Sequence, residues 1–569
     1  MDKKAQLAKI FRDTAKILEI KGENIFRIRA YERAAQNLEG LTEDIETYVR
    51  EGRLTQIPGI GRDLAQKITE YVTTGRLESF EELKKAIPEG ILEFLNIPSV
   101  GPKTAKLLYD ALKIKNVQQL QQAISEGRLK GIPGIKEKTI ENILRGIELL
   151  HKGKERMNLA QAQRIAEEFL SKLKKLPEVK EISVAGSLRR RKETVRDIDI
   201  LVVSLKPSSV IDSFVHLPMV GEILSQGETK SSVRTCEDIQ VDCRIVPEKS
   251  YGAALLYFTG SKNFNIKIRQ FAQGLGLKIN EYGVFRGNRW LAGKTEEEIF
   301  RLLKMSYIEP ELREDNGEIE LAQSFSLPIL VSPKDIKGDF HVHSRWSDGV
   351  NSIKEISEAA LRLGYSYIAI TDHSQGLRVA RGLSIADLKK KKAEIERLNS
   401  SFSNFRIIFG AEVDIDSEGR LDYPDKVLKE FDLVIAAIHT GFKQSKEKLT
   451  RRLIGACKNR YVHILAHPTG RLWGVRPPYE IDLDELLKAC RQTNTAIEIN
   501  AYPDRLDIND VGARRAKELG VKLAIGTDAH SIEQLSAMEF GLAVARRAWL
   551  SAQDLLNSLS CDKFPQKST

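Results

Sequence analysis

Cysteine is scarce in this sequence: it accounts for five of 569 residues, an odd number, and no C-x-x-C pair occurs. This excludes a disulfide framework and argues against a cysteine-bound zinc, so we expect free thiols in a reducing compartment. Long apolar runs are also lacking, because none approaches the ~18–20 residues that span a bilayer. The first residues have neither the apolar core nor the small-residue cleavage site of a secretory signal. We therefore expect a cytoplasmic protein with no membrane partner.

Histidine is infrequent and unevenly distributed. Seven of the nine histidines follow residue 340, so the chain has two chemically different halves. A content of 41% hydrophobic and 30% charged residues is typical of a globular protein and excludes a wholly disordered or collagen-like chain. The length predicts three to five domains at ~100–200 residues each. The net charge of +10 suits a polyanionic partner, although a solvated basic surface would give the same value.

Three Gly/Pro turns divide the helical first 150 residues: IPGIG at 57–61, IPSVG at 97–101 and IPGI at 132–135. Each unit combines an apolar residue, a tight turn and a helix start, and the repeat resembles the helix-hairpin-helix motif. Glycine lets the backbone approach a phosphate, and the free amides at the helix start point at it, so binding would ignore base sequence. We predict DNA contacts at Gly59, Gly61, Gly101 and Lys103. The third turn has Lys136 in place of the second glycine, which favours a purely structural role for it. Plain helical-hairpin turns are the alternative for all three.

Residues 155–250 change to a mixed pattern. A helix over Leu159–Leu173 precedes β-rich runs at 182–185, 197–203 and 239–246, which is typical of an α/β or α+β domain. After a proline-containing linker near 321–333, a strand–helix unit repeats to the C-terminus. Its candidate strands are 339–343, 367–371, 407–413, 433–439, 462–467, 496–500 and 523–527. Seven parallel strands that alternate with helices predict a barrel related to the TIM type.

Three aspartates on the middle strands form a candidate metal site. Asp197 and Asp199 alternate along one strand and face the same side, and Asp242 lies on another apolar strand, where an unpaired charge would be costly. Such carboxylates suit two hard divalent cations, Mg or Mn, which perform phosphoryl transfer. Ser187 and the basic run at 189–192 could hold β- and γ-phosphates. An Asp-x-Asp pair by itself would more simply be a strand-end turn.

Residues 1 to about 318 resemble DNA polymerase family X, on these motifs and on the segment YFTGS at 257–261 with Asn265 and Arg269 after it. The resemblance implies that the three aspartates are the metal-binding catalytic triad. It further implies a nucleotide site made of Ser187, Arg190, Tyr257, Phe258, Gly260, Asn265 and Arg269. In that site Ser187 and Arg190 contact the triphosphate, and Tyr257 and Phe258 crowd the sugar. Asn265 contacts the nascent base, and Arg269 contacts the templating pair.

The sequence departs from this family pattern at a few positions. Arg196 replaces a small residue before the first aspartate, and Lys262 stands where the vertebrate repair enzyme has an acidic side chain. Lys67 matches the family's Schiff-base lysine, which removes a 5′-deoxyribose phosphate, but Phe26 and Arg27 replace a histidine and a lysine that support it. Amine attack needs burial or a cationic neighbour to lower the lysine pKa. The alternative is a lysine on a solvated face or near a DNA phosphate.

Nearly every strand of the C-terminal repeat ends in a potential metal ligand. In such barrels the catalytic groups gather at the carboxyl ends of the strands. Imidazole with carboxylate, and without thiolate, suits zinc, manganese or iron, and nine ligands suffice for about three ions. The candidates are His341, His343, Asp348, His373, Glu412, His439, His467, Asp528 and His530. His463 has no motif, and we interpret it as structural.

Residues 336–569 resemble the PHP (polymerase and histidinol phosphatase) domain, with every expected metal position filled. The resemblance implies a cluster of zinc or manganese ions that activates water and binds a phosphodiester. In bacterial and archaeal family X polymerases this domain implies 3′→5′ exonuclease activity. Cleavage at abasic sites is a further activity that it suggests.

These observations predict a multidomain fold. We expect a lyase-like helical domain at 1–85, a fingers-type helical domain at 86–150, an α+β nucleotidyltransferase palm at 151–249, a thumb at 250–318, a linker at 319–335 and a (β/α)7 barrel at 336–569. The predicted function is a monomeric repair-type DNA polymerase that binds nicked, gapped or primer–template DNA, adds dNTPs and trims 3′ ends. One alternative is a template-independent nucleotidyltransferase fused to a phosphoesterase. The other is a non-enzymatic DNA-end scaffold with structural metal sites.

Overall fold

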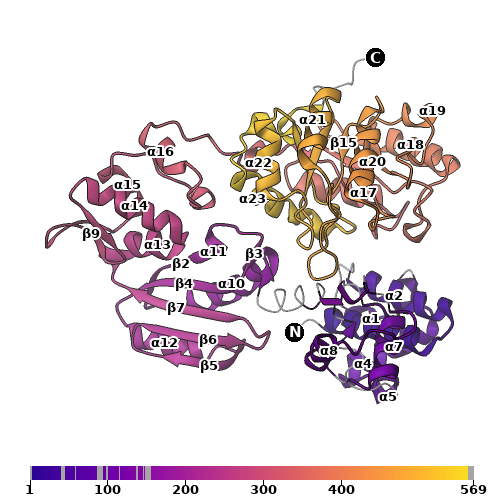
Figure 1. The fold of residues 1–569 in the computed structure, drawn as a ribbon, viewed down its shortest axis with the longest axis horizontal. Helices are drawn as coiled ribbons and strands as arrows, with labels where there is room; N and C mark the ends of the chain where they lie inside the picture. The colour runs from indigo at the N-terminus through magenta and orange to yellow at the C-terminus, as the bar shows by residue number, and fades with distance from the viewer. Residues whose placement is uncertain are drawn as a thin grey trace.

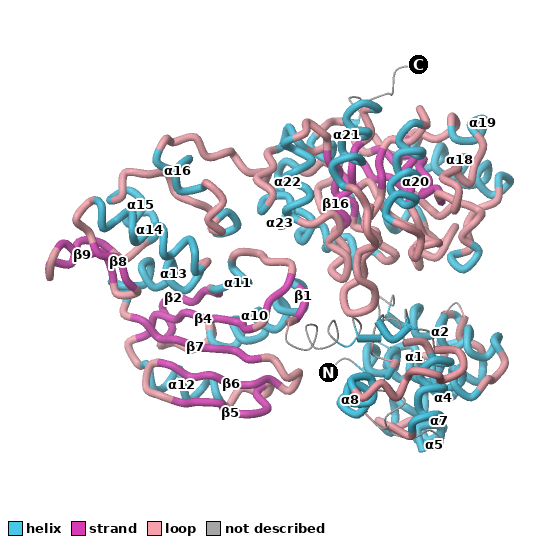
Figure 2. Tube along the Cα trace, in the orientation of Figure 1, coloured by secondary structure: helices cyan, strands magenta, loops and turns pink. Residues whose placement is uncertain are grey.

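The structure is a computed structural model that describes residues 3–561 apart from 40–44, 58, 86–93, 96, 98–99, 115, 136, 138, 142, 145–146 and 148–155. Three lobes follow one another along the chain: N-terminal helices, a middle lobe of mixed helices and sheets, and a C-terminal barrel (Figure 1). Figure 2 shows the strands gathered in the middle lobe and at the centre of the C-terminal lobe. None of the helices in these residues has the length and apolar character needed to cross a membrane.

The N-terminal lobe is helical, as the sequence predicts. Its elements include α1 (Lys3–Lys21), α2 (Ile25–Glu39), α3 (Ile45–Arg50), η1 (Leu54–Gln56), α4 (Arg62–Thr74), α5 (Glu78–Lys85), α7 (Pro102–Leu112) and α8 (Val117–Ser125). One buried apolar cluster runs through them. Gly61 and Gly101 are the N-cap residues of α4 and α7, and neither helix has a side-chain cap. Pro58, Pro98, Ser99 and Lys136 of the three turns lie outside the described residues.

The middle lobe contains a five-stranded sheet in the order β2-β4-β7-β6-β5. Only β4 and β7 pair in parallel; the other neighbours are antiparallel. Its elements are β1 (Met157–Asn158), α10 (Leu159–Leu173), β2 (Val179–Val184), α11 (Gly186–Arg189), β3 (Thr194–Val195), β4 (Asp197–Ser204), α12 (Pro207–Val215), β5 (Val220–Gln226), β6 (Lys230–Thr235) and β7 (Gln240–Val246). The predicted helix has the same bounds as α10. The predicted β-rich runs at 197–203 and 239–246, which carry the three aspartates, correspond to β4 and β7.

A smaller helical unit with a three-stranded sheet completes this lobe. Its elements are η2 (Glu248–Ser250), α13 (Tyr251–Thr259), α14 (Lys262–Gly274), β8 (Lys278–Asn280), β9 (Gly283–Arg286), β10 (Arg289–Ala292), α15 (Glu296–Leu302), η3 (Pro310–Leu312) and α16 (Glu318–Gln323). The segment predicted as a linker begins inside α16, whose Ile319 and Ala322 are buried in the apolar cluster of this unit. The first residues of that segment therefore pack as part of a domain.

The C-terminal lobe is the predicted barrel. Seven parallel strands follow one another in chain order: β11 (Gly338–Asp339), β12 (Tyr367–Ile370), β13 (Arg406–Asp414), β14 (Leu433–Ala437), β15 (Ile464–Leu465), β16 (Ala496–Asn500) and β17 (Leu523–Gly526). A parallel bridge between Val342 and Ala529 joins the two ends of the sheet. The helices are α17 (Ile353–Arg362), α18 (Ile385–Asn399), α19 (Asp425–Leu428), α20 (Lys446–Lys458), α21 (Leu483–Thr493), α22 (Asp510–Glu518) and α23 (Met538–Arg547).

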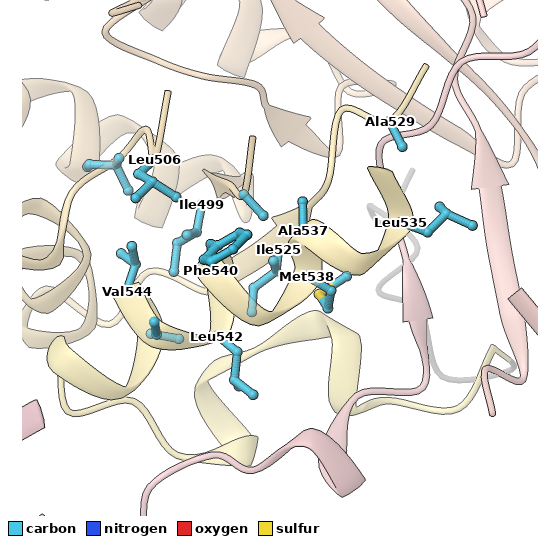
Figure 3. Close-up of a cluster of buried hydrophobic side chains, with 14 of the residues drawn as sticks. Ile499, Leu506, Ile525, Ala529, Leu535, Ala537, Met538, Phe540, Leu542 and Val544 are labelled. Carbon is cyan, nitrogen blue, oxygen red and sulfur yellow. The ribbon is translucent and has the colours of Figure 1, made fainter. Parts of the chain in front are cut away.

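Helix α23 packs against strands β16 and β17 of the barrel wall. Phe540 and Val544 of α23 belong to the same buried cluster as Ile499 and Ile525 of the strands (Figure 3). Helix and sheet approach closely at Gly541, where a Cβ atom would lie 2.5 Å from Ile525 Cγ2. Close apolar packing of this kind fixes the helix on the strands, and with it the polar side chains at the end of α23.

Polar contacts join the barrel to the middle lobe. The Arg471 guanidinium lies 2.7 Å from Glu193, and Asn158 Nδ2 donates to Asp504 Oδ1 at 2.7 Å. Further along, Trp549 of the barrel is buried in the apolar cluster of the 251–323 unit. The barrel is therefore packed against both parts of the middle lobe.

Candidate functional site

The three predicted aspartates of the middle lobe lie on the only parallel strand pair of its large sheet. Asp199 and Asp242 are direct register partners on β4 and β7, and Asp197 pairs with Gln240 one pleat away. Burial, and then the charges of Asp197 and Asp242, raise the pKa of Asp199 to about 7. Crowded carboxylates of this kind favour a bound cation, because without one they repel each other.

The turn that follows β2 packs against Asp199 of β4. Ala185 donates its amide to the Asp199 carbonyl at 2.8 Å, and Gly186 begins α11 with a φ of +60°. A Cβ atom on Gly186 would lie only 2.2 Å from Asp199 Oδ2, so glycine is needed for this approach. Ser187 follows on α11. Among the described residues, no group of three metal-ligand atoms within 4.8 Å includes the three aspartates, so their oxygens are spread more widely than those of the barrel.

The predicted nucleotide-selection residues form one connected unit on α13 and α14. The Asn265 amide donates to the Tyr257 carbonyl at 2.6 Å, and Arg269 Nε donates to the Asn265 carbonyl at 2.9 Å. The rings of Tyr257 and Phe258 meet edge to face at 5.1 Å. Arg244 of β7, two residues beyond Asp242, stacks over Phe258 at 4.5 Å. These contacts place the aromatic pair next to the acidic strand.

The basic run at 189–192 is largely engaged by protein groups. Arg189 makes a two-pronged contact with Glu296, which also binds the fully buried Arg313. Arg190 Nε donates to Glu314 at 3.0 Å, and its Nη1 donates to the Thr259 carbonyl beside Gly260. Arg191 contacts Gln163 and Glu539. Arg189 also donates to Thr259 Oγ1 at 2.7 Å, so two of the three arginines contact the predicted nucleotide segment.

The barrel brings the predicted ligands together at the carboxyl ends of its strands. Three overlapping groups of ligand atoms each lie within 4.8 Å: His343, Asp348, His373 and His530; His341, His343 and Asp528; and His373, Glu412 and His439. His467 lies outside these groups but contacts one of them, because its Nε2 is 2.8 Å from Glu412 Oε1. All nine predicted residues therefore meet in one place.

The chemistry of these buried atoms fits metal ions. His343 Nδ1, His373 Nδ1, His467 Nδ1 and Glu412 Oε2 are buried without a hydrogen-bond partner in the described structure. His373 Nδ1 approaches Glu412 Oε2 to 2.8 Å, but without hydrogen-bond geometry. Burial and the neighbouring His530 and His373 lower the pKa of His343 to about 4, which leaves it in the neutral, coordinating form. Unpartnered ring nitrogens beside carboxylates are the donor set that zinc and manganese take.

Four further residues orient the ligands, and the sequence pattern did not identify them. Glu498 lies 2.7 Å from His341 Nδ1 and accepts the His467 amide at 2.6 Å. Asp414 accepts from His439 Nδ1, Asn500 donates to Asp528 Oδ2 at 3.1 Å, and Arg505 Nε lies 3.2 Å from the same oxygen. Glu498 lies on β16 inside the predicted strand 496–500, so its position was a usable signal, whereas Asp414 ends β13 one residue beyond the predicted strand 407–413. Such outer partners fix the ring orientation of metal-binding histidines.

A cavity of about 490 Å³ opens beside these groups. Asp348, Asp528 and His530 line it from the barrel, together with Arg505, and Arg12 and Lys16 line it from α1. Arg505 Nη1 is buried and has no hydrogen-bond partner among the described residues. The cavity therefore combines ligand carboxylates with cationic groups from two lobes.

Two other residues from the sequence analysis, Lys67 and His463, have defined polar contacts in the structure. Lys67 on α4 forms an ion pair with Asp63 at 2.5 Å, so its neighbour is a carboxylate rather than a cation. His463 Nδ1 accepts the Val434 amide at 3.1 Å, which agrees with its structural interpretation.

Four family models match the chain. They are described as a helix-hairpin-helix domain at residues 2–77, a SAM-like helix-hairpin-helix tandem at 91–148, a DNA polymerase beta thumb at 254–314 and a PHP domain at 339–502. The matched ranges follow the order of the helical lobe, the smaller unit of the middle lobe and the barrel.

Curated relatives match both the whole chain and its parts. The chain is 40% identical over 562 residues to DNA polymerase/3′-5′ exonuclease PolX of Bacillus subtilis (strain 168), covering 98% of each chain. It is 33% identical over 232 residues to a probable phosphatase of Thermoanaerobacter sp. (strain X514), covering 39% of this chain and 89% of that one. It is 25% identical over 333 residues to DNA polymerase lambda of Rattus norvegicus, covering 53% and 54%.

Proposed function

We propose a function from the premise that this chain belongs to the family X DNA polymerases with a C-terminal PHP domain, as its identity to PolX over the full length shows. The proposed function is gap-filling DNA synthesis in the middle lobe and 3′→5′ exonuclease activity in the barrel. One observation carries it: a single chain holds the Asp199–Asp242 register pair and, separately, eight clustered histidine and carboxylate side chains with His467 in contact with them.

In the polymerase site, Asp197, Asp199 and Asp242 would hold two Mg or Mn ions. When bound, these ions would activate a primer 3′-hydroxyl and stabilise the departing pyrophosphate. Ser187 and Arg190 hold the triphosphate. The paired rings of Tyr257 and Phe258 exclude a ribose 2′-hydroxyl, and Asn265, Gly260 and Arg269 set the position of the new base pair.

In the barrel, the nine ligands would hold about three zinc or manganese ions. When bound, these ions would supply an activated water and bind the phosphodiester. The chain's own contribution is cationic: Arg505, whose buried Nη1 has no hydrogen-bond partner in the described structure, lines the cavity together with Arg12 and Lys16 of α1. These groups would hold the backbone phosphates of the strand being shortened.

The helical lobe would hold the DNA duplex by its backbone. Gly61 and Gly101 leave the first amides of α4 and α7 without side-chain caps, and Gly59 and Lys103 flank the same turns. Amides at a helix start bind phosphate irrespective of sequence. Cleavage at abasic sites by the barrel and lyase activity at Lys67 are finer parts of the same proposal.

A second candidate for the barrel is a phosphatase of small molecules. The observation that favours it is the 33% identity over 232 residues to a probable phosphatase, which covers 89% of that protein. The distinguishing assay compares release of inorganic phosphate from p-nitrophenyl phosphate with shortening of a DNA 3′ end. Release without shortening would favour the phosphatase.

The test uses one gapped DNA with a mismatched primer end, incubated in Mg or Mn with and without dNTPs. We expect shortening without dNTPs and extension with them. Asp197→Ala with Asp199→Ala should abolish extension only, and His341→Ala with His343→Ala should abolish shortening only.

Asp212 on α12 and His216, its C-cap residue, offer a control pair of the same residue types, because both side chains are exposed, at 70% and 69%. Replacing both with alanine should change neither activity. Extension that survives the double aspartate change would refute the polymerase assignment, and shortening that survives the double histidine change would refute the exonuclease assignment.

A further inference from the structure

Arg547, the last residue of α23, connects the barrel to the polymerase half through a nearly buried side chain. Its Nε and Nη2 bind Asp510 within the barrel at 2.8 and 2.7 Å. Its Nη1 points out of the barrel, donating to the Arg190 carbonyl at 2.8 Å and to Glu314 Oε1 at 3.1 Å. The side chain is only 5% exposed, so water does not compete for these contacts.

Glu314 joins this side chain to Arg190. The same oxygen, Oε1, accepts from Arg190 Nε at 3.0 Å, so two guanidinium groups share one carboxylate oxygen. Burial raises the pKa of Glu314, but Arg190 and Arg547 outweigh it and hold that pKa below its ordinary value. The far end of Arg190 reaches Gly260, where a Cβ atom would lie 3.1 Å from Arg190 Nη1. A continuous set of contacts thus runs from the barrel to the nucleotide segment.

From these contacts we propose that Arg547 is a positioning residue for DNA synthesis: by holding Glu314 and the Arg190 carbonyl, it keeps the Arg190 guanidinium available to the dNTP triphosphate. This inference rests on the proposed function of the middle lobe. Without Arg547, the Glu314 carboxylate would be free to turn both oxygens to the fork of Arg190. Arginine and carboxylate prefer this bidentate arrangement, and it would compete with the triphosphate.

Replacing the neighbouring Arg546 distinguishes a positioning role of Arg547 from a general role in joining the two lobes. It also lies at the end of α23 and binds the same unit, with Nε 2.7 Å from Glu311 and Nη1 3.1 Å from the Val331 carbonyl. In the described structure, Arg546 makes no hydrogen bond or ion pair with Arg190 or Glu314. Loss of Arg546 therefore weakens the contact between the lobes without releasing Glu314.

The experiment measures KM for dNTP and kcat in single-nucleotide gap filling by the full chain. Arg547→Ala should raise KM by about tenfold, as expected for loss of a charged hydrogen bond, with kcat within about twofold. Arg546→Ala should leave KM within about twofold. Adding Glu314→Gln to Arg547→Ala should restore KM, because a neutral amide does not capture Arg190. A merely structural role would not give this rescue.

Arg547→Lys serves if the alanine variant does not fold, because it keeps a charge beside Asp510 but lacks the fork that reaches Glu314. It should raise KM in the same direction. An unchanged KM in a folded Arg547 variant, an equal rise in Arg546→Ala, or no rescue by Glu314→Gln would each overturn the proposal. Absence of extension by the unaltered chain would instead overturn the proposed function together with it.

Discussion

Replacing Gly186 with alanine should disable DNA synthesis by moving one carboxylate. The new Cβ would lie 2.2 Å from Asp199 Oδ2 and 3.3 Å from its Cγ, whereas real Cβ contacts essentially never fall under 3.0 Å. The carboxylate must therefore shift by close to one ångström. The φ of +60° at this position adds ~1–2 kcal/mol of backbone strain for any residue with a Cβ.

The magnitude follows from how steeply catalysis depends on geometry. A misplacement of about 1 Å costs about 100-fold in rate, so we expect kcat for gap filling to fall by about two orders of magnitude. Exonuclease activity, measured on the same preparation without dNTPs, should stay within about twofold, because the barrel ligands lie on other strands.

Gly274→Ala is the matched control. Gly274 ends α14, and a Cβ there would meet no atom within 4 Å. This variant should retain both activities. The reasoning would be refuted if Gly186→Ala folds and extends primers at a near-normal rate. A parallel loss of exonuclease activity would also refute it, since that would indicate damage to the whole molecule.

Two other predictions concern the middle and helical lobes. Glu296→Gln should lower the free energy of unfolding by ~3–5 kcal/mol in urea titrations, because it leaves the buried Arg313 and the half-buried Arg189 without their carboxylate. Glu297→Gln on the exposed face of α15 should not lower it. Although burial opposes it, the arginines lower the pKa of Glu296 to about 2, so its stabilisation is complete above its ordinary value of 4.5 and is lost as the pH falls towards 2. Lys67→Ala should abolish borohydride trapping of a 5′-deoxyribose phosphate end while Lys103→Ala retains it; trapping that persists without Lys67 would exclude it as the nucleophile.

The grouping of the candidate metal ligands could be predicted because most of them follow from strand periodicity and from the topology of a parallel barrel. Asp197 and Asp199 alternate on one strand and so face the same side. In a parallel barrel the carboxyl ends of all strands lie at one rim, independent of the conformation of the loops. The sequence identified His341 and Glu412 by this rule. It missed Glu498, because a carboxylate inside an apolar strand could serve a ligand or stand as a buried structural group. The domain boundaries and the roles of the site residues stay predictions.

The arginine run marks the limit of sequence reasoning. Its charge suggested phosphate binding at 189–192, but Arg189 is taken by Glu296, 107 residues away in sequence. Partners at such separations are set by how the smaller unit packs on the large sheet, and no local pattern encodes them. Arg189 and Arg190 both reach Thr259 of the predicted nucleotide segment, and Arg190 also lies beside Gly260.

The residue composition of this chain changes near residue 336, but the parts on either side of that point pack against each other. The seven histidines after residue 340 separate two reactions by composition, yet Trp549 of the barrel is buried in the apolar cluster of the 251–323 unit. Arg547, two residues earlier, shares Glu314 with Arg190. A large buried aromatic and a buried ionic group beside it fix the orientation of two lobes more firmly than a flexible tether would. If Arg190 binds the dNTP as proposed, the barrel forms part of its support through Arg547 and Glu314. Changes in that support should then appear in nucleotide affinity before they appear in the chemistry of either site.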